Sequence, residues 1–355
     1  MGRTRTWKIG VLGLHHDHVW THVAELMARG DAQVAVADAD EQLRERARAE
    51  FGVTRVHDDY AALLEAEQPD AVLIFTDNAA KAAVVELAAS HGKPIMLEKP
   101  MADCLANAER MRVAANVAGV PLMVNWPTVW NPAVRHAYEL AAHGAIGELT
   151  RFNFRGGHGG PKEYGCSPQF YGWLYDRARN GAGAYIDYCG YGASLACGLL
   201  GLPSRAQACI ARVQKDYVDV DDNAVLVLRY PRALAVIEAT WTSAGPVQGS
   251  GPMLSGTTGT LVARHRQARH EGEEGELGLV YHVTRERPDG QFFEPPELPD
   301  SERSAVEHFL SCLAADQPFL PLVSLQLGRD TQEILEAGLR AARDGREVSL
   351  PLDVV

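Results

Sequence analysis

KIGVLGLHHDHVWTHVAELMARGDAQVAVAD, residues 8–38, sets the architecture of the first part of the chain through its hydrophobic pattern. Its first five residues, 8–12, are mostly apolar and predict a buried strand that ends at Gly13. Apolar residues at helical spacing follow over 19–28, and residues 33–37 predict a second strand. A strand, a glycine turn, a helix and a second strand form one unit of a parallel sheet.

The same alternation continues outward from this unit as far as residue 125. It predicts helices at 40–51, 58–67, 79–91 and 105–118, and strands at 71–75, 94–97 and 121–125. Strands that alternate with helices form a parallel sheet covered by helices on both faces. We therefore expect an α/β chain whose residues 1–125 form a doubly wound, nucleotide-binding Rossmann domain.

The pattern changes at Trp126, where longer strand candidates with twofold alternation begin. These strands are predicted at 148–155, 205–213, 224–230, 234–242, 260–263 and 280–284, with helices at 132–142, 190–200, 304–314 and 325–342. Few helices separate the later strands, so residues 126–355 are expected to form an α+β domain with a large open, mostly antiparallel sheet. We expect this domain to bind substrate and to dimerise through its open face, giving a homodimer or homotetramer, and its last helix to pack back on the Rossmann domain. The polar segment 264–277, with His265 and His270, is expected to be an exposed turn.

Composition excludes several classes of protein. With 355 residues, 46% of them hydrophobic and 23% charged, the chain is a globular protein of about two domains. The net charge of −12 and the lack of a Lys/Arg block argue against nucleic acid as a partner. We find no apolar run of about 20 residues and no signal-peptide pattern, so no membrane association is expected. The six cysteines are scattered without CxxC pairs, which predicts free thiols and a cytoplasmic protein.

The turn after the first strand is where a dinucleotide pyrophosphate binds in a doubly wound fold. The usual fingerprint is G-x-G-x-x-G, and here its three positions hold Gly13, His15 and His18. Bulky residues should keep the backbone further from the phosphates, so an imidazole of His15, His16 or His18 is expected to donate a hydrogen bond instead. Asp17 would repel a phosphate and is expected to cap the following helix.

Asp38 ends the second predicted strand, about 20 residues beyond this turn. A carboxylate there accepts hydrogen bonds from the adenosine ribose hydroxyls and repels a 2′-phosphate. No arginine follows immediately, since the next residues are Ala39 and Asp40. This favours NAD over NADP as cofactor; the alternative is a solvent-exposed aspartate in a turn.

The histidine cluster also raises the question of a metal site. His18 and His22 are four residues apart and would share one face of a helix, as two ligands of one ion must. No third ligand with fitting spacing follows from the sequence. We therefore expect no metal.

Two further motifs resemble the Gfo/Idh/MocA oxidoreductase family. In IFTDNAAKAAVVELAASHGKPIMLEKPMA, residues 74–102, Asp77 replaces the usual proline and Lys81 the usual histidine, while the matching residues are Thr76, Asn78, Gly92, Lys93, Glu98, Lys99 and Pro100. The second motif is GAGAYIDYCGY, residues 181–191, in which Asp187 matches and Tyr191 occupies the usual histidine position. Tyrosine at that position is similar to the glucose–fructose oxidoreductase branch of the family.

This resemblance implies an NAD(P)-dependent dehydrogenase that acts on sugars, cyclitols or similar polyols. The cofactor-binding residues are then expected to be Gly13, His15, His16, Asp38, Thr76, Asn78, Glu98 and Lys99. Of the expected catalytic residues, Lys99 would hydrogen-bond the reacting oxygen, Tyr191 would relay the proton, and Asp187 would orient the substrate or Lys99. Lysine and tyrosine both have a usual pKa near 10, so one of the two values should be lowered in the folded protein.

Substrate contacts are predicted from residues that follow these motifs. The family commonly has N-x-R after the fifth strand, and here Thr128 takes the place of the arginine, which favours a neutral carbohydrate. The predicted substrate residues are Asn125, Trp126, His158 and Trp173, because aromatic faces stack on sugar rings. Asp221 and Asp222 are expected to cap the start of a strand.

Two other functions stay open at the level of sequence. One is redox-neutral cleavage of a glycoside by an enzyme that retains its NAD, and the altered phosphate turn is compatible with such retention. The other is a non-catalytic nucleotide-sensing protein on the same fold, against which the intact Lys99, Asp187 and Tyr191 speak.

Overall fold

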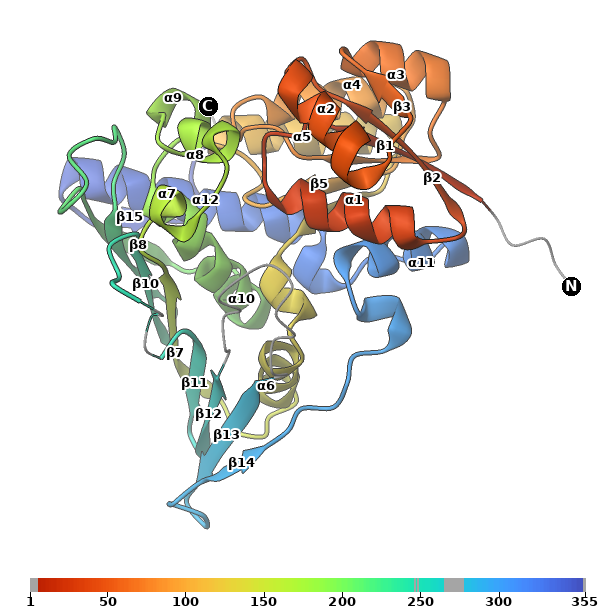
Figure 1. The fold of residues 1–355 in the computed structure, drawn as a ribbon. Coiled ribbons are helices and arrows are strands. Elements are labelled where there is room, and N and C mark those ends of the chain that lie inside the picture. Colours follow the sequence, from red (N-terminus) through yellow and green to blue (C-terminus); the bar gives the residue numbers. More distant parts are fainter. Residues whose placement is uncertain (1–5, 246, 248, 265–277, 354–355) are drawn as a thin grey trace, which may run out of the picture.

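The computed structural model of the chain describes residues 6–245, 247, 249–264 and 278–353. Its first sheet has six parallel strands in the order β3-β2-β1-β4-β5-β6, which confirms the predicted doubly wound fold (Figure 1). The strands are β1 (Trp7–Leu12), β2 (Ala32–Ala37), β3 (Arg55–His57), β4 (Ala71–Ile74), β5 (Ile95–Glu98) and β6 (Leu122–Asn125). The helices between them are α1 (His18–Ala28), α2 (Glu41–Phe51), α3 (Tyr60–Glu67), α4 (Lys81–Ser90) and α5 (Leu105–Ala118).

Local chemistry explains where these elements begin and end. Strands β4 and β5 are buried along their whole length, as expected for central parallel strands covered on both faces. Asp40 and Asp59 cap α2 and α3, because each carboxylate accepts a hydrogen bond from a backbone N–H of the first turn. The direction in which successive strands are added to the sheet reverses between β1 and β4. Ligands of such sheets bind at the carboxyl ends of the strands near that point.

The second sheet has nine strands in the order β14-β13-β12-β11-β7-β10-β9-β8-β15. All neighbours are antiparallel except β7 and β10, so the predicted mostly antiparallel sheet is confirmed. Its strands are β7 (Leu149–Gly157), β8 (Arg205–Ala211), β9 (Asn223–Arg229), β10 (Leu234–Thr240), β11 (Gly251–Gly256), β12 (Gly259–Arg264), β13 (Leu279–Thr284), β14 (Gln291–Phe293) and β15 (Val348–Ser349).

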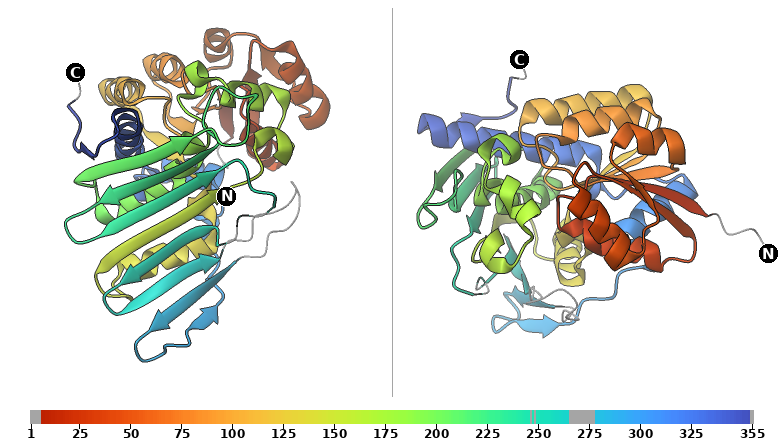
Figure 2. Two further views of the ribbon diagram at one scale, coloured as in Figure 1. Left: turned by 90° about the vertical axis from the view of Figure 1, so that its left-hand side faces the viewer. Right: turned by 45° about the horizontal axis from the view of Figure 1, so that its top comes forward.

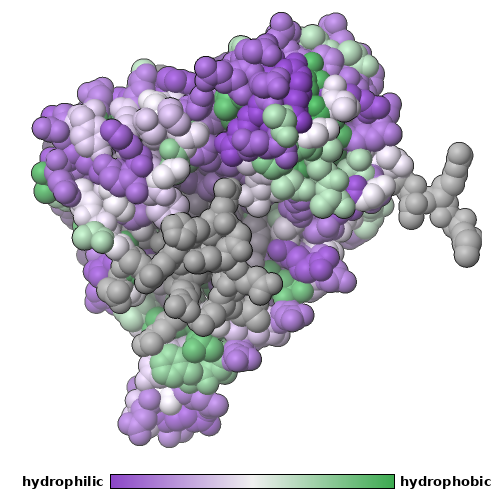
Figure 3. Space-filling model, viewed as in Figure 1, coloured by the Kyte–Doolittle hydropathy of each residue, from purple (hydrophilic) through white to green (hydrophobic). Residues whose placement is uncertain are grey.

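One face of this sheet packs against helices and the other is open, as the left view of Figure 2 shows. The covering helices are α6 (Pro132–Ala142), α10 (Gly190–Leu200) and α12 (Leu325–Asp344). In β9, Ala224 and Leu226 are buried on the covered face while Val225 between them is exposed, which is the alternation of a half-covered strand. The face of the molecule in Figure 3 is largely hydrophilic, with hydrophobic colour near β13 and β14, where Leu279 and Phe292 are exposed.

Helix α12 connects the two sheets (Figure 1). It packs against α5 of the first sheet and against β8 of the second. The Tyr185 hydroxyl donates a hydrogen bond of 2.9 Å to the Leu335 carbonyl, and the Ala102 amide donates one of 3.4 Å to Gln332. Helix α11 (Ala305–Ala315) and the 3-10 turns η1 (Pro127–Trp130), η3 (Asp300–Glu302) and η4 (Pro321–Val323) complete this part of the chain.

Several short elements lie outside the sequence prediction. They are the strands β3, β11, β14 and β15, the helices α7 (Pro161–Tyr164), α8 (Pro168–Leu174) and α9 (Arg177–Asn180), and the π-helical turn η2 (Tyr185–Cys189). Four to seven residues are too few to show a helical period, so α7 to α9 left no signal. The turn predicted at 264–277, with His265 and His270, lies outside the described residues apart from its first residue, which ends β12.

Two further observations concern cysteines and membranes. All six cysteines are free thiols, as their spacing predicted. Among the helices in the described part of the chain, none combines the length and the apolar character that a membrane span requires.

Candidate active site

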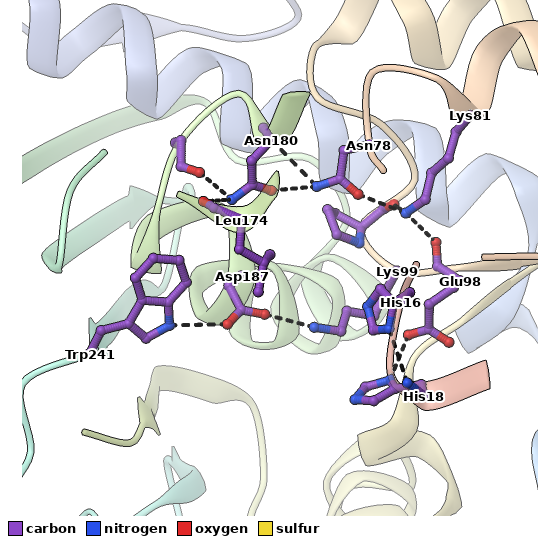
Figure 4. Close-up of polar contacts among 12 residues, drawn as sticks. His16, His18, Asn78, Lys81, Glu98, Lys99, Leu174, Asn180, Asp187 and Trp241 are labelled. Atoms are coloured by element: carbon purple, nitrogen blue, oxygen red, sulfur yellow. Dashed lines mark hydrogen bonds and ion pairs between the residues drawn. The ribbon is translucent and has the colours of Figure 1, made fainter. Parts of the chain in front are cut away.

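The two motifs meet at the carboxyl end of β5. Lys99 follows β5, Asp187 lies on η2 and Tyr191 lies in the first turn of α10. The Lys99 Nζ is 2.7 Å from the Asp187 Oδ1 (Figure 4). It is also 4.8 Å from the centre of the Tyr191 ring. The structure thus brings the three predicted catalytic residues together, although 92 residues of sequence separate Lys99 from Tyr191.

Asp187 is held in place by the turn that precedes it. The Asp221 carboxylate accepts hydrogen bonds from the backbone N–H groups of Gly183 (2.7 Å) and Tyr185 (2.8 Å). Position 183 requires glycine because an added Cβ would lie 1.9 Å from the Asp221 carbonyl oxygen. The Trp241 indole donates a further hydrogen bond of 3.1 Å to the Asp187 Oδ2.

Asp221 and Asp222 directly precede strand β9, as predicted, but their carboxylates accept hydrogen bonds from other segments and do not cap that strand. Asp221 holds the turn before Asp187, and the Asp222 carboxylate accepts the backbone N–H groups of residues 213–215. The backbone amides of residues 213–215 and of the turn at 183–185 lack partners in a regular ladder; Asp222 satisfies the first group and Asp221 the second. Asp221 is therefore a positioning residue that sequence reasoning missed.

The charges of the site are paired. Burial acts to lower the pKa of Lys99, but the nearby carboxylate of Asp187 outweighs it and raises that pKa overall. Burial acts to raise the pKa of Asp187, and the Lys99 ammonium holds it below its usual value. Burial raises the pKa of Tyr191 to about 12. The prediction that the pKa of Lys99 or of Tyr191 is lowered is therefore wrong, and both groups are hydrogen-bond donors at neutral pH.

These residues line a cavity of about 800 Å³ between the two sheets. Its wall includes Lys99, Asp187 and Tyr191 together with the aromatic residues His158, Tyr164 and Tyr188. The His158 ring stacks on Tyr164 at 4.8 Å and meets Tyr188 edge-on at 5.4 Å.

His158 is the one predicted substrate residue on this wall. Its Nδ1 accepts a hydrogen bond from the Gly160 N–H (2.9 Å), and burial lowers its pKa to about 4. His158 is therefore neutral, with its Nε2 protonated as a donor. Sequence reasoning missed Tyr164 and Tyr188; Tyr188 directly follows Asp187 in the second motif, whereas Tyr164 carries no signal in a single sequence.

The other three predicted substrate residues do not line the cavity. Asn125 is buried, and its amide donates to the Glu98 Oε2 at 2.8 Å. Trp126 is buried behind Tyr191, with 5.8 Å between the ring centres. Trp173 is buried too, and its indole donates to the His15 carbonyl at 3.3 Å. Their expected contact with substrate finds no support in this geometry, because each side chain already packs inside the protein.

The turn after β1 is tight and partly covered. Gly13 has a φ of +88°, and an added Cβ would lie 2.9 Å from the Thr76 backbone nitrogen, so this glycine lets the turn approach the neighbouring strand. His16 is buried, with its ring 4.3 Å from that of Phe170. The prediction that Asp17 caps α1 is wrong, because its carboxylate turns away and accepts hydrogen bonds from the N–H (2.7 Å) and hydroxyl (2.6 Å) of Ser167.

Asp38 is fully buried, which excludes the alternative of a solvent-exposed turn aspartate. Its carboxylate accepts hydrogen bonds from the Leu14 N–H (2.6 Å) and the Asp40 N–H (2.8 Å). The His15 Nδ1 lies 3.0 Å from its Oδ2, and hydrogen bonding to Asp38 raises the pKa of His15. His15 thus covers the carboxylate that was expected to bind the ribose.

No arginine follows Asp38 immediately in the sequence, but the fold brings Arg44 close to it. The first turns of α2 bring its guanidinium back to the end of β2, where it donates to the carbonyls of Asp38 (2.6 Å) and Ala39 (3.0 Å). The helix predicted from Asp40 onward could have indicated this contact, because Arg44 lies about one turn after Asp40.

Three other predicted cofactor residues, Thr76, Asn78 and Glu98, are buried near the carboxyl ends of β4 and β5. Thr76 donates to the Asp77 carbonyl at 3.2 Å, and Asn78 bonds to Lys81 and Asn180. The Glu98 carboxylate accepts from Asn125 and lies 3.0 Å from the His18 Nδ1.

Glu98 also completes a group of three potential metal ligands with His16 and His18, whose ligand atoms lie within 4.8 Å of one another. The expectation that the histidines lack a third ligand was wrong, because Glu98 comes from a distant strand. The His18 N–H donates to the His16 Nδ1 at 3.3 Å, and both Glu98 oxygens have partners, so the group is satisfied without an ion.

The residues around this turn fit a dinucleotide. In the part of the chain that the structure describes, the backbone N–H groups of His15 and Asp17 have no hydrogen-bond acceptor. No side chain caps the N-terminus of α1, which lies beside them. Free amides at a helix N-terminus bind phosphate, and the buried Asp38 carboxylate suits a ribose once His15 moves aside.

Three features together define a Rossmann-type oxidoreductase architecture with a second, sheet-forming domain. They are the doubly wound sheet, the turn after β1 (residues 13–17, here called the nucleotide turn), and the lysine–aspartate–tyrosine group formed by Lys99, Asp187 and Tyr191. Comparison with known families agrees. Residues 8–126 match the oxidoreductase family with an NAD-binding Rossmann fold, and residues 134–262 match the GFO/IDH/MocA C-terminal domain. The chain belongs to the Gfo/Idh/MocA family, as the two motifs predicted.

Similar proteins with assigned activities include several sugar dehydrogenases. The chain is 38% identical over 138 residues to a D-apiose dehydrogenase of Paraburkholderia graminis, an alignment that covers 39% of this chain and 36% of that enzyme. It is 25% identical over 256 residues to a levoglucosan dehydrogenase of Pseudarthrobacter phenanthrenivorans, covering 65% of each chain. The chain thus spans 36% and 42% of the lengths of the two apiose dehydrogenases it matches.

Solved structures show the same fold over nearly the whole chain. An aldose–aldose oxidoreductase from Caulobacter crescentus in complex with glycerol superposes with a TM-score of 0.80 at 23% identity, covering 98% of this chain and all of that one. A levoglucosan dehydrogenase in complex with NADH and levoglucosan gives a TM-score of 0.79 at 20% identity, with coverage of 98% and 100%.

Proposed function

We propose that this protein is an NAD-dependent dehydrogenase that transfers a hydride between nicotinamide and a secondary alcohol of a sugar, cyclitol or related polyol. The observation that carries the proposal is the Lys99–Asp187 pair, at 2.7 Å, in one cavity with Tyr191. The sugar dehydrogenases among its relatives support the substrate class.

The chain's own residues bind and polarise the reacting group. The Lys99 ammonium, held by Asp187, donates a hydrogen bond to the oxygen at the reacting carbon and stabilises negative charge on it. In the direction of reduction, the Tyr191 hydroxyl gives its proton to the same oxygen; in the direction of oxidation, it takes up the alcohol proton while it releases its own proton to solvent. The bound nicotinamide supplies or accepts the hydride. His158, Tyr164 and Tyr188 offer aromatic surface and one neutral N–H donor to the rest of a sugar ring.

We assign the cofactor to the crevice above β1 and β2. The free amides of His15 and Asp17 would hold the pyrophosphate, and Asp38 the adenosine ribose. Asp38 disfavours a 2′-phosphate, and the Arg44 guanidinium already bonds two carbonyls and Glu41, which supports NAD over NADP. In this proposal residues 1–125 bind the cofactor and residues 126–355 bind the substrate.

A panel of polyols and aldoses with NAD, followed by absorbance of NADH, tests the activity. At least one neutral sugar or cyclitol should give NADH, and Lys99→Met should lower kcat by about 10²–10⁴-fold. A Lys99→Met variant as active as the wild type would contradict the proposed role, and a nucleotide-binding protein with no turnover on any substrate would support a sensor instead.

One observation favours a redox-neutral variant of this function. Residues 161–180 of the second domain close over the nucleotide turn, through the bonds of Ser167 to Asp17 and of the Trp173 indole to the His15 carbonyl. Such a cover would slow release of a dinucleotide between turnovers. Free NADH that accumulates during turnover would exclude this variant, and NAD released only by heat denaturation would support it.

We also propose that the open face of the nine-stranded sheet joins two copies of the chain. Val225, Leu234 and Met253 are 38%, 49% and 36% exposed on strands of this sheet, a surface that a partner sheet would cover. The six free cysteines suit a reducing compartment, which supports a cytoplasmic location. Light scattering on the purified protein should give twice or four times the mass of the chain.

A further inference from the structure

Lys81 is a charged residue that the proposed chemistry does not use. It begins α4 and takes the place where similar sequences have histidine, yet it is completely buried. Its Nζ donates three hydrogen bonds: to the Asn78 Oδ1 (2.8 Å), to the Glu98 carbonyl (2.8 Å) and to the Pro100 carbonyl (2.7 Å). An ammonium has three donors, so every N–H of Lys81 is used (Figure 4).

The acceptors show what this lysine holds. The carbonyls of Glu98 and Pro100 stand on either side of Lys99, so one ammonium fixes the backbone both before and after that residue. None of the three acceptors is a carboxylate. Burial lowers the pKa of Lys81 to about 7, because the protein interior disfavours the charged form. Groups this perturbed are concentrated at functional sites.

The third acceptor, Asn78, connects Lys81 to the segment that carries Asp187. Asn78 turns its amide nitrogen to the Asn180 Oδ1 at 2.7 Å, and both side chains are completely buried. The Asn180 amide in turn donates to the carbonyls of Leu174 (2.9 Å) and Ala182. Ala182 lies five residues before Asp187 in the same glycine-rich motif. Hydrogen bonds thus connect Lys81 to the backbone before and after Lys99 and, through Asn78 and Asn180, to the backbone that precedes Asp187.

We propose that Lys81 is a positioning residue that sets the geometry of Lys99 relative to Asp187, through the carbonyls on either side of Lys99 and through Asn78 and Asn180. The inference rests on the proposed role of Lys99. The charged groups that act on Lys81 are Glu98, Lys99, Asp77 and Asp103. In the proposed arrangement Lys81 touches neither cofactor nor substrate. Misplacing a reacting group by about 1 Å lowers turnover by about 10²-fold, so this network has a measurable effect on rate.

Lys81→His, which introduces the residue common in similar sequences, is the principal test, because Lys81→Met leaves three buried acceptors without a donor and endangers the fold. Lys81→His should keep a cooperative melting transition and lower kcat by about 10–100-fold while KM and the Kd for NAD change by less than about threefold. Lys93→Met, on the loop between α4 and β5, is the matched control and should keep the wild-type kcat.

Asn180→Ala breaks the same network at a distance from Lys81. If both residues act through one network, the double variant Lys81→His/Asn180→Ala should lose less activity than the product of the single losses. Fully multiplicative losses would show two independent effects and would contradict the proposal.

A crystal structure of Lys81→His gives a readout that does not depend on turnover. The 2.7 Å distance between the Lys99 Nζ and the Asp187 Oδ1 should lengthen or the pair should separate. An unchanged distance together with an unchanged kcat would overturn the inference. If Lys99→Met retained activity, the proposed function would fail instead, and the distance in Lys81→His would still decide the role of Lys81.

Discussion

Replacing Asp187 by asparagine tests the paired charges at the centre of the site. The side chains of Lys99 and Asp187 are only 5% and 12% exposed, so water solvates neither well. Both Asp187 oxygens accept hydrogen bonds, one from Lys99 and one from the Trp241 indole. An asparagine has one acceptor oxygen, and its NH₂ group would face one of these two donors.

Removing one partner of a buried ion pair destabilises a protein by about 3–5 kcal/mol. The entropy of unfolding is about 2.1 cal/mol/K per residue, so a chain of 355 residues loses roughly 1.3 °C per kcal/mol, and the melting midpoint of Asp187→Asn should fall by about 4–7 °C. Asp300→Asn is the control, because that side chain is 93% exposed and its replacement should change stability by less than about 0.5 kcal/mol. The free energy of unfolding is measured by denaturant titration with a fluorescence readout.

The pH dependence of this loss follows from the pKa shifts. The pKa of Lys99 is raised above its usual 10.5, so its stabilising contribution is present below that pH. The pKa of Asp187 is lowered below its usual 3.8, so its contribution is present above that pH and disappears in stronger acid. The stability difference between wild type and Asp187→Asn should therefore be constant from about pH 5 to 9 and shrink below about pH 4. An Asp187→Asn variant with wild-type stability and wild-type kcat would refute the pairing.

Four further predictions concern the cofactor, the metal question and assembly. Asp38→Ser should shift the ratio of kcat/KM for NAD over NADP toward NADP by at least about tenfold, measured with both cofactors. Because protonated His15 holds Asp38, the Kd for NAD from fluorescence titration should rise as pH falls through the raised pKa of His15, and His15→Ala should abolish this dependence. Elemental analysis should find less than stoichiometric zinc, and EDTA should leave activity unchanged; full zinc occupancy would assign a metal to His16, His18 and Glu98. Val225→Lys should convert the oligomer to smaller species in light scattering, and an unchanged mass would place the interface elsewhere.

The sequence alone predicted the fold because the two domains differ in hydrophobic period. Alternating strands and helices up to residue 125 and twofold alternation beyond it are local patterns, and both sheets have the predicted type. The three residues of the lysine–aspartate–tyrosine group were found because they stand in motifs with fixed spacing. Short elements such as α7 to α9 were not found, since their position depends on packing against the nucleotide turn and not on local preference.

Contacts between distant segments account for the remaining errors. Asp17 was expected to cap α1, but Ser167 offers its carboxylate two donors from the other domain. The pKa values of Lys99 and Tyr191 differ from the prediction because burial raises the pKa of the Tyr191 phenol, and because the Asp187 carboxylate outweighs the effect of burial on the Lys99 ammonium. The position of Glu98 beside His16 and His18 did not follow from the sequence either, because it depends on the order of the strands in the sheet.

A crystal structure of the protein grown with millimolar NAD tests the central claim most directly. We predict the adenosine ribose on the Asp38 carboxylate with His15 turned away, and the nicotinamide ring in the cavity beside Lys99 and Tyr191. An empty crevice at saturating NAD, or a nicotinamide ring outside the cavity that contains the Lys99–Asp187 pair, would contradict it.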